Sequence, residues 1–284
     1  MSSKIYFSDR SGAKPLSYYG IKALSSTVAR IAPAIGKKFA RRLLLTPVRH
    51  RAKVSKPQGM SNYTINTEFE ALHMYELGQG PVVLFTHGWS GSASQFYPLM
   101  ERVAASGFKA VAFDHYGHGM SAGKEANLPL FIRALDAVQT HLNEPVYTAI
   151  SHSMGCVAAL NTICSRSHIL IAPPFDFYNG FEQRILSTGI SKTLFKSVIQ
   201  SVEQQHQMPF ESLLPELHLT KHDNVLIIHD VQDRFARYDN TQTVVKQYPH
   251  VQLMSTQGLG HGRIINDEQT WQSVQNQLQQ LQAQ

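Results

Sequence analysis

The strongest constraint on the fold is an alternation of short apolar runs with longer helix-like segments, from residue 82 almost to the end of the chain. Apolar, β-branched runs predict buried strands, and apolar residues at three- and four-residue spacing predict helices. Strands are expected at 82–86, 110–113, 146–150, 169–172, 225–229 and 251–254, and helices at 94–105, 128–142, 154–165, 241–247 and 267–281. This alternation is typical of an α/β protein with a mostly parallel, doubly wound sheet and right-handed crossovers.

Two segments depart from the alternation. Residues 63–69 and 72–77 alternate apolar and polar side chains, which predicts a hairpin that enters the sheet. Residues 173–223 are helix-like and too long for a plain loop, so we expect a small helical cap over the sheet edge where open α/β folds bind ligands. The alternative is a surface pair of helices whose apolar side chains form only their own core.

Residues 1–60 are expected to form a basic, amphipathic helical arm, and residues 61–284 the α/β domain that carries the cap. Apolar spacing predicts one helix around residues 21–31, and Pro33 suits the first turn of a second helix. In this second helix the apolar residues are expected on one side and the basic residues on the other: Ile35, Phe39, Leu43 and Leu44 against Lys37, Lys38, Arg41 and Arg42.

Charge is distributed unevenly along the chain. Residues 1–56 hold 13 of the 26 basic residues and one acidic residue, Asp9, so their net charge is +12 and that of the remainder is −6. A nucleic-acid enzyme more often spreads basic residues over its working face, so we expect no nucleic-acid partner. Residues 1–56 could instead contact an anionic membrane peripherally, or pack on the rest of the protein with a solvated basic face.

The sequence favours a cytoplasmic protein. No apolar stretch reaches the roughly 20 residues of a membrane span, and residues 1–10 lack the apolar core of a secretory signal. Cys156 and Cys164 are expected on one helix about 12 Å apart, too far for a disulfide. Two free thiols suit a reducing compartment, although an Arg-rich, acid-poor start also fits a mitochondrial presequence.

One serine lies where a strand is expected to turn sharply into a helix. Ser153 is the centre of Ser151-His152-Ser153-Met154-Gly155. Such a turn strains its central residue and needs small residues two places before and after, which Ser151 and Gly155 provide. This arrangement is the nucleophile elbow, which exposes a hydroxyl at a helix N-terminus. The alternative is an ordinary strand-to-helix turn that carries a surface serine.

A serine nucleophile needs a base within hydrogen-bond reach and a carboxylate that orients the base. Asp233 follows strand 225–229 and His261 follows strand 251–254, so both are expected at the same sheet edge as Ser153. The rival acids are Asp230, three residues earlier, and Asp239, which already leads into a helix. The rival bases are His152, whose side chain should diverge from that of Ser153, and His229, which we expect to pack within the strand.

The oxyanion of an acyl-transfer intermediate needs two N–H donors. Met154, directly after the nucleophile, is expected to supply one, and Trp89 in the loop after strand 82–86 the other. Gly88 would allow close approach of that backbone, and His87 would support the loop. His115 and His118 have an H-x-x-H spacing, but without further clustered ligands they predict no metal site.

Together these motifs resemble the α/β-hydrolase superfamily, and within it the capped, monoacylglycerol-lipase-like esterases and S33 serine aminopeptidases. The matching pieces are residues 87–91, 113–121 and 151–155, the Asp233 loop, and Gly260-His261. Departures are Ser151 for the first elbow glycine, Cys156 and Asp230 where glycine is frequent, and His115-Tyr116 for an Arg/Pro turn. The resemblance implies that Asp114 fixes its loop, and that dehalogenation and epoxide opening, which use an aspartate nucleophile, do not fit Ser153.

The sequence therefore predicts an α/β-hydrolase fold with a helical cap, and a serine hydrolase that cleaves a carboxylic ester of a small to medium apolar substrate. Ser153, His261 and Asp233 would form the triad, and no cofactor is expected. Two alternatives remain. One is acyl transfer, thioester cleavage or perhydrolysis by the same triad, and the other is a non-catalytic ligand-binding homologue.

Overall fold

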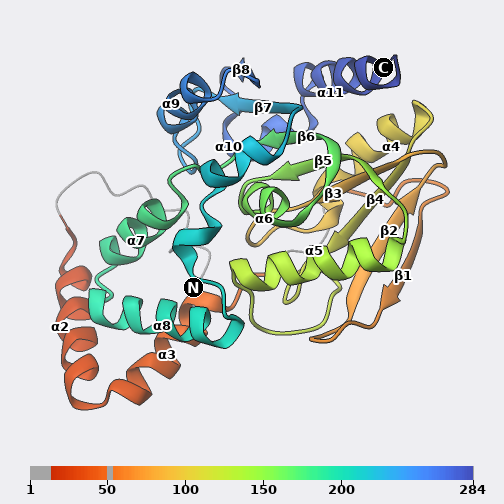
Figure 1. Ribbon diagram of the computed structural model, residues 1–284. Helices are drawn as coiled ribbons and strands as arrows, with labels where there is room; N and C mark the ends of the chain where they lie inside the picture. Colours follow the sequence, from red (N-terminus) through yellow and green to blue (C-terminus); the bar gives the residue numbers. More distant parts are fainter. Residues whose placement is uncertain (1–13, 50–53, 284) are drawn as a thin grey trace.

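The computed structural model describes residues 14–49 and 54–283 (Figure 1). Its centre is an eight-stranded sheet with the order β1-β2-β4-β3-β5-β6-β7-β8. β1 and β2 run antiparallel to each other, β2 is also antiparallel to β4, and all the other neighbouring strands are parallel. The strands are β1 (Ser61–Ile65), β2 (Leu72–Leu77), β3 (Val82–Thr86), β4 (Lys109–Asp114), β5 (Val146–His152), β6 (Ser165–Ile171), β7 (Val225–Asp230) and β8 (Val251–Thr256).

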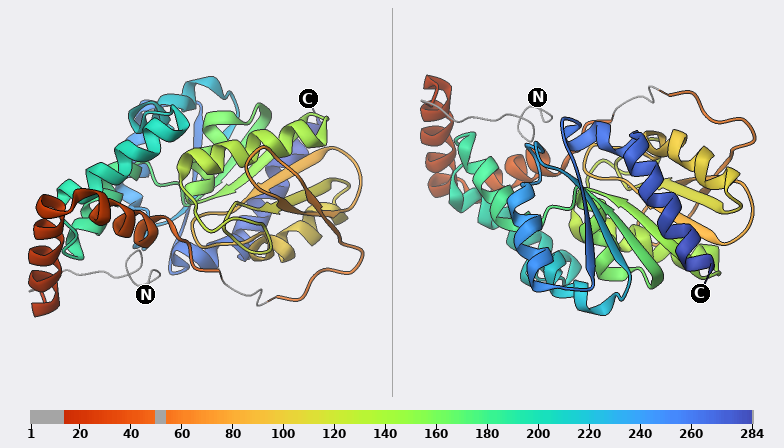
Figure 2. Two further views of the ribbon diagram at one scale, coloured as in Figure 1. Left: turned by 90° about the horizontal axis from the view of Figure 1, so that it is seen from below. Right: turned by 90° about the horizontal axis from the view of Figure 1, so that it is seen from above.

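Helices cover both faces of the sheet (Figure 2). Alternate side chains of a strand point to opposite faces, so Val82 and Leu84 of β3 belong to one core, and Val83 and Phe85 to the other. α5 (Leu128–Leu142) and α6 (Met154–Thr162) cover the first face, and α4 (Tyr97–Ala105) and α11 (Glu268–Gln282) the second. The other helical elements of the main domain are η1 (Ala93–Phe96), α9 (Tyr238–Gln247), α10 (Gly260–Arg263) and η4 (Ile264–Asn266).

The expected elements are present, with changes at several of their boundaries. The first strand of the hairpin ends at Ile65, because the Thr67 hydroxyl accepts the N–H groups of Phe69 and Glu70 and makes a turn. The helix after Ser153 ends at Thr162 instead of 165, and β6 begins at Ser165. Cys164 therefore lies in the connection after the helix, and the spacing argument along a shared helix was wrong. Cys156 and Cys164 are both free.

The segment between β6 and β7 forms the expected helical cap. It contains α7 (Phe177–Ser187), α8 (Lys192–His206) and the 3₁₀ helices η2 (Phe210–Leu213) and η3 (Pro215–Lys221). Phe195 and Val198 of α8 are buried in the same core cluster as Phe131 of α5 and Met154 of α6. The apolar side chains of the cap thus pack together with the main domain and do not form a separate core.

Two helices, α2 (Leu16–Ile31) and α3 (Pro33–Leu45), precede the sheet and pack on α8 of the cap. Pro33 occupies the first turn of α3, as the sequence predicts. The four apolar residues expected on one side of α3 do not pack together, because Leu44 and Leu43 contact the core and the other two do not. Gly36, Ala40 and Leu44 are buried, whereas Ile35 and Phe39 are each 70% exposed. Small residues allow the α3 and α8 backbones to approach, since a Cβ on Gly36 would lie 2.9 Å from Leu194.

Arg41 also lies on the inner side of α3, where it pairs with Glu125 and donates to the Ser201 hydroxyl. Residues 1–13 and 50–53 of the predicted arm lie outside the described residues, and the division at residue 60 stays a prediction. Among the helices of residues 14–49 and 54–283, none has both the length and the apolar character needed to cross a bilayer.

Candidate active site

Ser153 lies between the last residue of β5 and the first residue of α6, in a strained backbone conformation with φ 53° and ψ −125°. The tight turn depends on Gly155, because a Cβ there would lie 2.6 Å from the Thr86 carbonyl oxygen and 2.8 Å from that of His87. Ser151, in the place of the first elbow glycine, is fully buried, and its hydroxyl has no hydrogen-bond partner among the described residues. The elbow therefore accommodates this departure.

The structure brings the three predicted side chains into one hydrogen-bonded series. His261 Nε2 lies 2.9 Å from Ser153 Oγ, and His261 Nδ1 lies 2.7 Å from Asp233 Oδ2. Burial raises the pKa of Asp233, but hydrogen bonds from His229 and His261 outweigh this effect and hold the pKa well below its ordinary value. Asp233 is thus a carboxylate, and it fixes His261 with Nδ1 protonated and Nε2 facing the serine hydroxyl.

The rival acids have other partners. Asp230 is fully buried and accepts hydrogen bonds from the Thr256 hydroxyl and the Leu259 N–H, each at 2.9 Å. It thereby ties the end of β8 and the loop before His261 to β7. Asp239 pairs with Arg237 at 3.4 Å on the surface.

Two histidines that the sequence argument set aside contact residues of the candidate triad. His152 Nε2 donates to the His261 carbonyl oxygen at 2.9 Å, and the Gln95 side chain lies 3.3 Å from Nδ1. Burial, followed by the charge of His261, lowers the pKa of His152 to about 3. His229 is fully buried, with Nε2 3.1 Å from the Ala236 carbonyl oxygen and 3.4 Å from Asp233 Oδ2. The His152 contact has no sequence signal, because it joins residues 109 positions apart, whereas the His229 contact lies within β7 and the segment that follows it.

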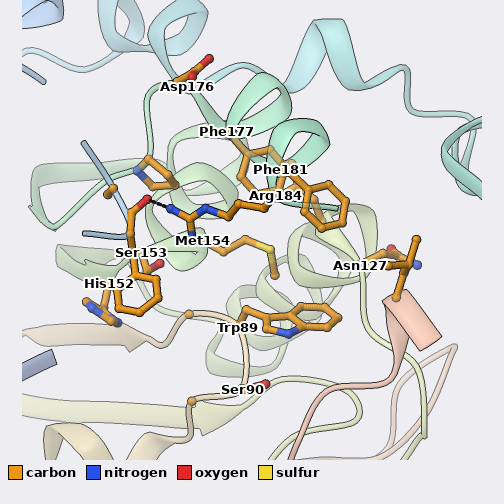
Figure 3. Close-up of a pocket in the computed structure, with 18 of the residues that line it drawn as sticks. Trp89, Ser90, Asn127, His152, Ser153, Met154, Asp176, Phe177, Phe181 and Arg184 are labelled. Atoms are coloured by element: carbon orange, nitrogen blue, oxygen red, sulfur yellow. Dashed lines mark hydrogen bonds between the residues drawn. The ribbon is translucent and has the colours of Figure 1, made fainter. Parts of the chain in front are cut away.

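The candidate oxyanion donors lie beside Ser153. Met154 is the first residue of α6, and N–H groups in the first turn of a helix lack intrahelical partners and favour negative charge. The loop after β3 approaches from the other side, since a Cβ on Gly88 would lie 2.7 Å from Ser153 Cβ and 3.3 Å from its Oγ. Trp89, the next residue, lines the same cavity as Met154 (Figure 3).

Buried imidazoles hold this loop. His87 donates to the Gly88 carbonyl oxygen at 2.7 Å and accepts the His115 N–H at 3.0 Å. His118 accepts the Ser90 N–H at 3.0 Å, and His115 lies 2.7 Å from the Thr86 hydroxyl. Burial lowers the pKa of all three rings, so they are neutral at pH 7. Residues 14–49 and 54–283 contain no group of three or more side chains that could hold a metal ion.

Asp114 fixes the neighbouring loop, as the resemblance implied. Its carboxylate accepts N–H groups from Ala93 and Met120, each at 2.8 Å, and the Tyr75 hydroxyl at 3.0 Å. These bonds join β2, η1 and the loop after β4.

A cavity of about 290 Å³ opens onto Ser153 and His261. Phe177 and Phe181 of α7 lie on its cap side (Figure 3), and Ile199, Val202 and Phe210 extend this apolar wall. Such a volume lies at the lower end of the range for small-molecule pockets.

Two further features of the cavity could not be predicted from the sequence. Leu44 and Leu45 of α3 line it, so the N-terminal helices form part of its wall. Arg184 of α7 also lines it and donates to the Phe235 carbonyl oxygen, with its guanidinium 5.5 Å from the centre of the Phe235 ring. Phe235 follows Asp233 by two residues, so Arg184 ties the cap to the loop that contains Asp233.

Comparisons with known proteins identify relatives over parts of the chain. An epoxide hydrolase of Caballeronia sordidicola is 30% identical over 166 residues, which cover 56% of this chain and 47% of that protein. A probable lysophospholipase of Arabidopsis thaliana is 28% identical over 124 residues, 40% of this chain and 29% of that protein. The chain thus spans less than half the length of these curated relatives.

Among solved structures, an esterase of Pyrococcus furiosus has a TM-score of 0.63 at 19% identity, covering 82% of this chain and 98% of that one. At this identity the likeness shows the fold. The family model for serine aminopeptidase, S33, matches residues 79–272, well over half of the chain. With its mostly parallel sheet and flanking helices, the chain belongs to the S33 serine aminopeptidase family of α/β-hydrolases.

Proposed function

We propose that the protein is a serine esterase that hydrolyses carboxylic esters of small to medium apolar acids. The hydrogen-bonded series Asp233–His261–Ser153, with contacts of 2.7 and 2.9 Å at the base of an apolar cavity, carries this proposal. A protonated His261 Nδ1 leaves Nε2 free to accept the serine proton, which is the arrangement that activates a serine hydroxyl.

In the first half of the reaction, Ser153 Oγ attacks the ester carbonyl carbon while its proton moves to His261 Nε2. The N–H groups of Trp89 and Met154 stabilise the oxyanion. The C–O bond to the alcohol then breaks, and His261 gives the proton to the leaving alkoxide. In the second half, His261 takes a proton from water, and the hydroxide forms a new C–O bond with the acyl carbon. The bond between that carbon and Ser153 Oγ then breaks, the proton passes from His261 to Ser153 Oγ, and the acid leaves.

The residue at the elbow distinguishes this chemistry from epoxide opening. One relative is named an epoxide hydrolase, and α/β-hydrolases that open epoxides use an aspartate nucleophile. Residue 153 of this chain is a serine. We therefore expect turnover of p-nitrophenyl esters and no turnover of a simple terminal epoxide.

Covalent labelling tests the proposal. A fluorophosphonate probe should add once to the wild-type protein and not to Ser153→Ala. Ser151→Ala is a matched control two residues away, and it should still be labelled because its hydroxyl has no hydrogen-bond partner among the described residues. A series of p-nitrophenyl esters should show highest kcat/KM at short to medium acyl chains. A folded wild-type protein without an adduct would contradict the proposal, and product analysis with added alcohol separates hydrolysis from acyl transfer.

A further inference from the structure

The N-terminal helix pair exposes an unusual amount of apolar surface. Seven of the twelve large apolar side chains that are exposed in the described residues belong to α2 and α3: Leu16, Tyr19, Ile21, Leu24, Ile31, Ile35 and Phe39. No residue of α2 is buried. Figures 1 and 2 show α2 at the edge of the molecule farthest from the sheet, where a flat partner can reach it.

The most exposed apolar residues of α2 form one stripe. Leu16, Leu24 and Ile31 are 90%, 67% and 79% exposed, and their spacing places them on the same side of the helix. Ser25 marks a different side, where its hydroxyl donates to the Gly189 carbonyl oxygen and accepts the Ser191 N–H, both at 3.0 Å. The cap therefore contacts the Ser25 side of α2, and the apolar stripe is turned outward.

The next helix repeats this arrangement. α3 packs on the cap through its small residues and leaves Ile35 and Phe39, one turn apart, each 70% exposed. Lys38 and Arg42 follow Ile35 at three and seven residues and are also exposed. The outer side of α3 thus combines apolar and basic side chains.

The charge of the helix pair selects among possible partners. Residues 14–49 contain eight basic and no acidic residues. Arg41 pairs with Glu125, and Lys14, Lys22, Arg30, Lys37, Lys38 and Arg42 have no carboxylate partner within the described residues. A second copy of this face would bring like charges together. An anionic bilayer complements both properties, because apolar side chains enter the headgroup boundary and basic ones contact the lipid phosphates.

We propose that the outer face of α2 and α3 docks on the surface of an anionic lipid bilayer. The same helix α3 places Leu44 and Leu45 in the wall of the cavity above Ser153, and the Val48 N–H donates to the Ser90 hydroxyl in the oxyanion loop at 3.1 Å. Docking thus brings the cavity that opens onto Ser153 close to the membrane, so the substrate class is an acyl ester held in a lipid surface. This second statement rests on the proposed esterase function.

Vesicle flotation with the full chain tests the docking. The wild-type protein should float with vesicles of phosphatidylcholine and phosphatidylglycerol and not with phosphatidylcholine alone. Lys38→Gln with Arg42→Gln should weaken binding roughly 30-fold, from the attraction of two basic residues. Leu24→Ser with Ile31→Ser should weaken it at least roughly tenfold through lost apolar burial. Leu217→Ser, which changes a 54% exposed leucine in the cap segment, should bind as wild type.

Three outcomes would overturn the docking proposal: no wild-type flotation with anionic vesicles, full binding by the Leu24/Ile31 variant, or a wild-type dimer in light scattering that this variant abolishes. The esterase proposal fails separately. Both double variants should hydrolyse a soluble p-nitrophenyl ester as wild type does, whereas Ser153→Ala should float normally without hydrolysis. Equal activity of wild type and the double variants on an ester embedded in anionic vesicles would contradict the substrate class.

Discussion

A buried histidine should make the stability of this protein depend on pH in a way that one substitution can isolate. His168 lies in β6, fully buried, with the His222 ring 4.1 Å away. Burial, followed by the charge of His222, lowers the pKa of His168 from 6.5 to about 3. In the unfolded chain the ring regains the ordinary pKa of a histidine, about 6.5.

Proton binding determines whether the free energy of unfolding rises or falls with pH. Below pH 6.5 the unfolded chain binds a proton at His168, whereas the native protein does not bind it until the pH nears 3. The free energy of unfolding therefore falls as the pH decreases from about 6.5 to about 3. The stabilisation is complete above pH 6.5. From there to pH 5 the loss is about 1.4 kcal/mol for each pH unit, which amounts to about 2 kcal/mol.

The test compares wild type with His168→Leu by urea unfolding at about pH 7.5 and about pH 5. The packing cost of the substitution is the same at both pH values and cancels in the difference. The variant should therefore lose about 2 kcal/mol less than wild type on acidification. Thr148→Val, which alters a buried residue of β5 without a titrating group, should keep the wild-type difference. If His168→Leu and wild type lose stability equally, to within about 0.5 kcal/mol, the assignment of a depressed pKa is refuted.

Two further predictions concern the site. Gly88→Ala should lower kcat/KM for a p-nitrophenyl ester at least about 100-fold, because the new methyl group would lie 2.7 Å from Ser153 Cβ. Gly20→Ala, where nothing lies within 4 Å, should keep full activity. A Gly88→Ala enzyme with wild-type kcat/KM would show that the added methyl group does not displace Ser153. Asp233→Asn should lower kcat about 10⁴-fold. Asp230→Asn should lower kcat much less, since Asp230 contacts a loop and not His261. If Asp230→Asn lowered kcat more than Asp233→Asn, Asp230 would be the orienting acid.

The nucleophile elbow, and the order of the triad residues along the chain, could be predicted from the local sequence. Ser153 could be recognised because a strand, a small-residue turn and a helix follow one another directly between residues 146 and 165. Asp233 and His261 could be placed on the same edge because residues just after parallel strands meet there. These inferences need only the period of each segment and the rule that neighbouring strands are parallel.

The packing of the N-terminal helices could not be read in the same way. An apolar stripe normally marks the buried side of a helix, yet α3 buries Gly36 and Ala40 and exposes Ile35 and Phe39. The small residues of α3 are buried because they allow close approach to α8. This packing depends on α8, which lies about 160 positions away in the chain. The entry of Leu44 and Leu45 into the cavity follows from the same packing.

The sequence by itself thus determined a parallel α/β sheet, a capped sheet edge and a serine, an aspartate and a histidine in that order. Only the tertiary structure decided which carboxylate faces His261, which histidines brace the site and which helix closes the cavity. The physical reason is the range of the interactions. Strand and helix periods are set by neighbours in the chain, whereas the partner of a side chain at a loop depends on the register of β7 with β8 and on how each loop closes across the sheet edge.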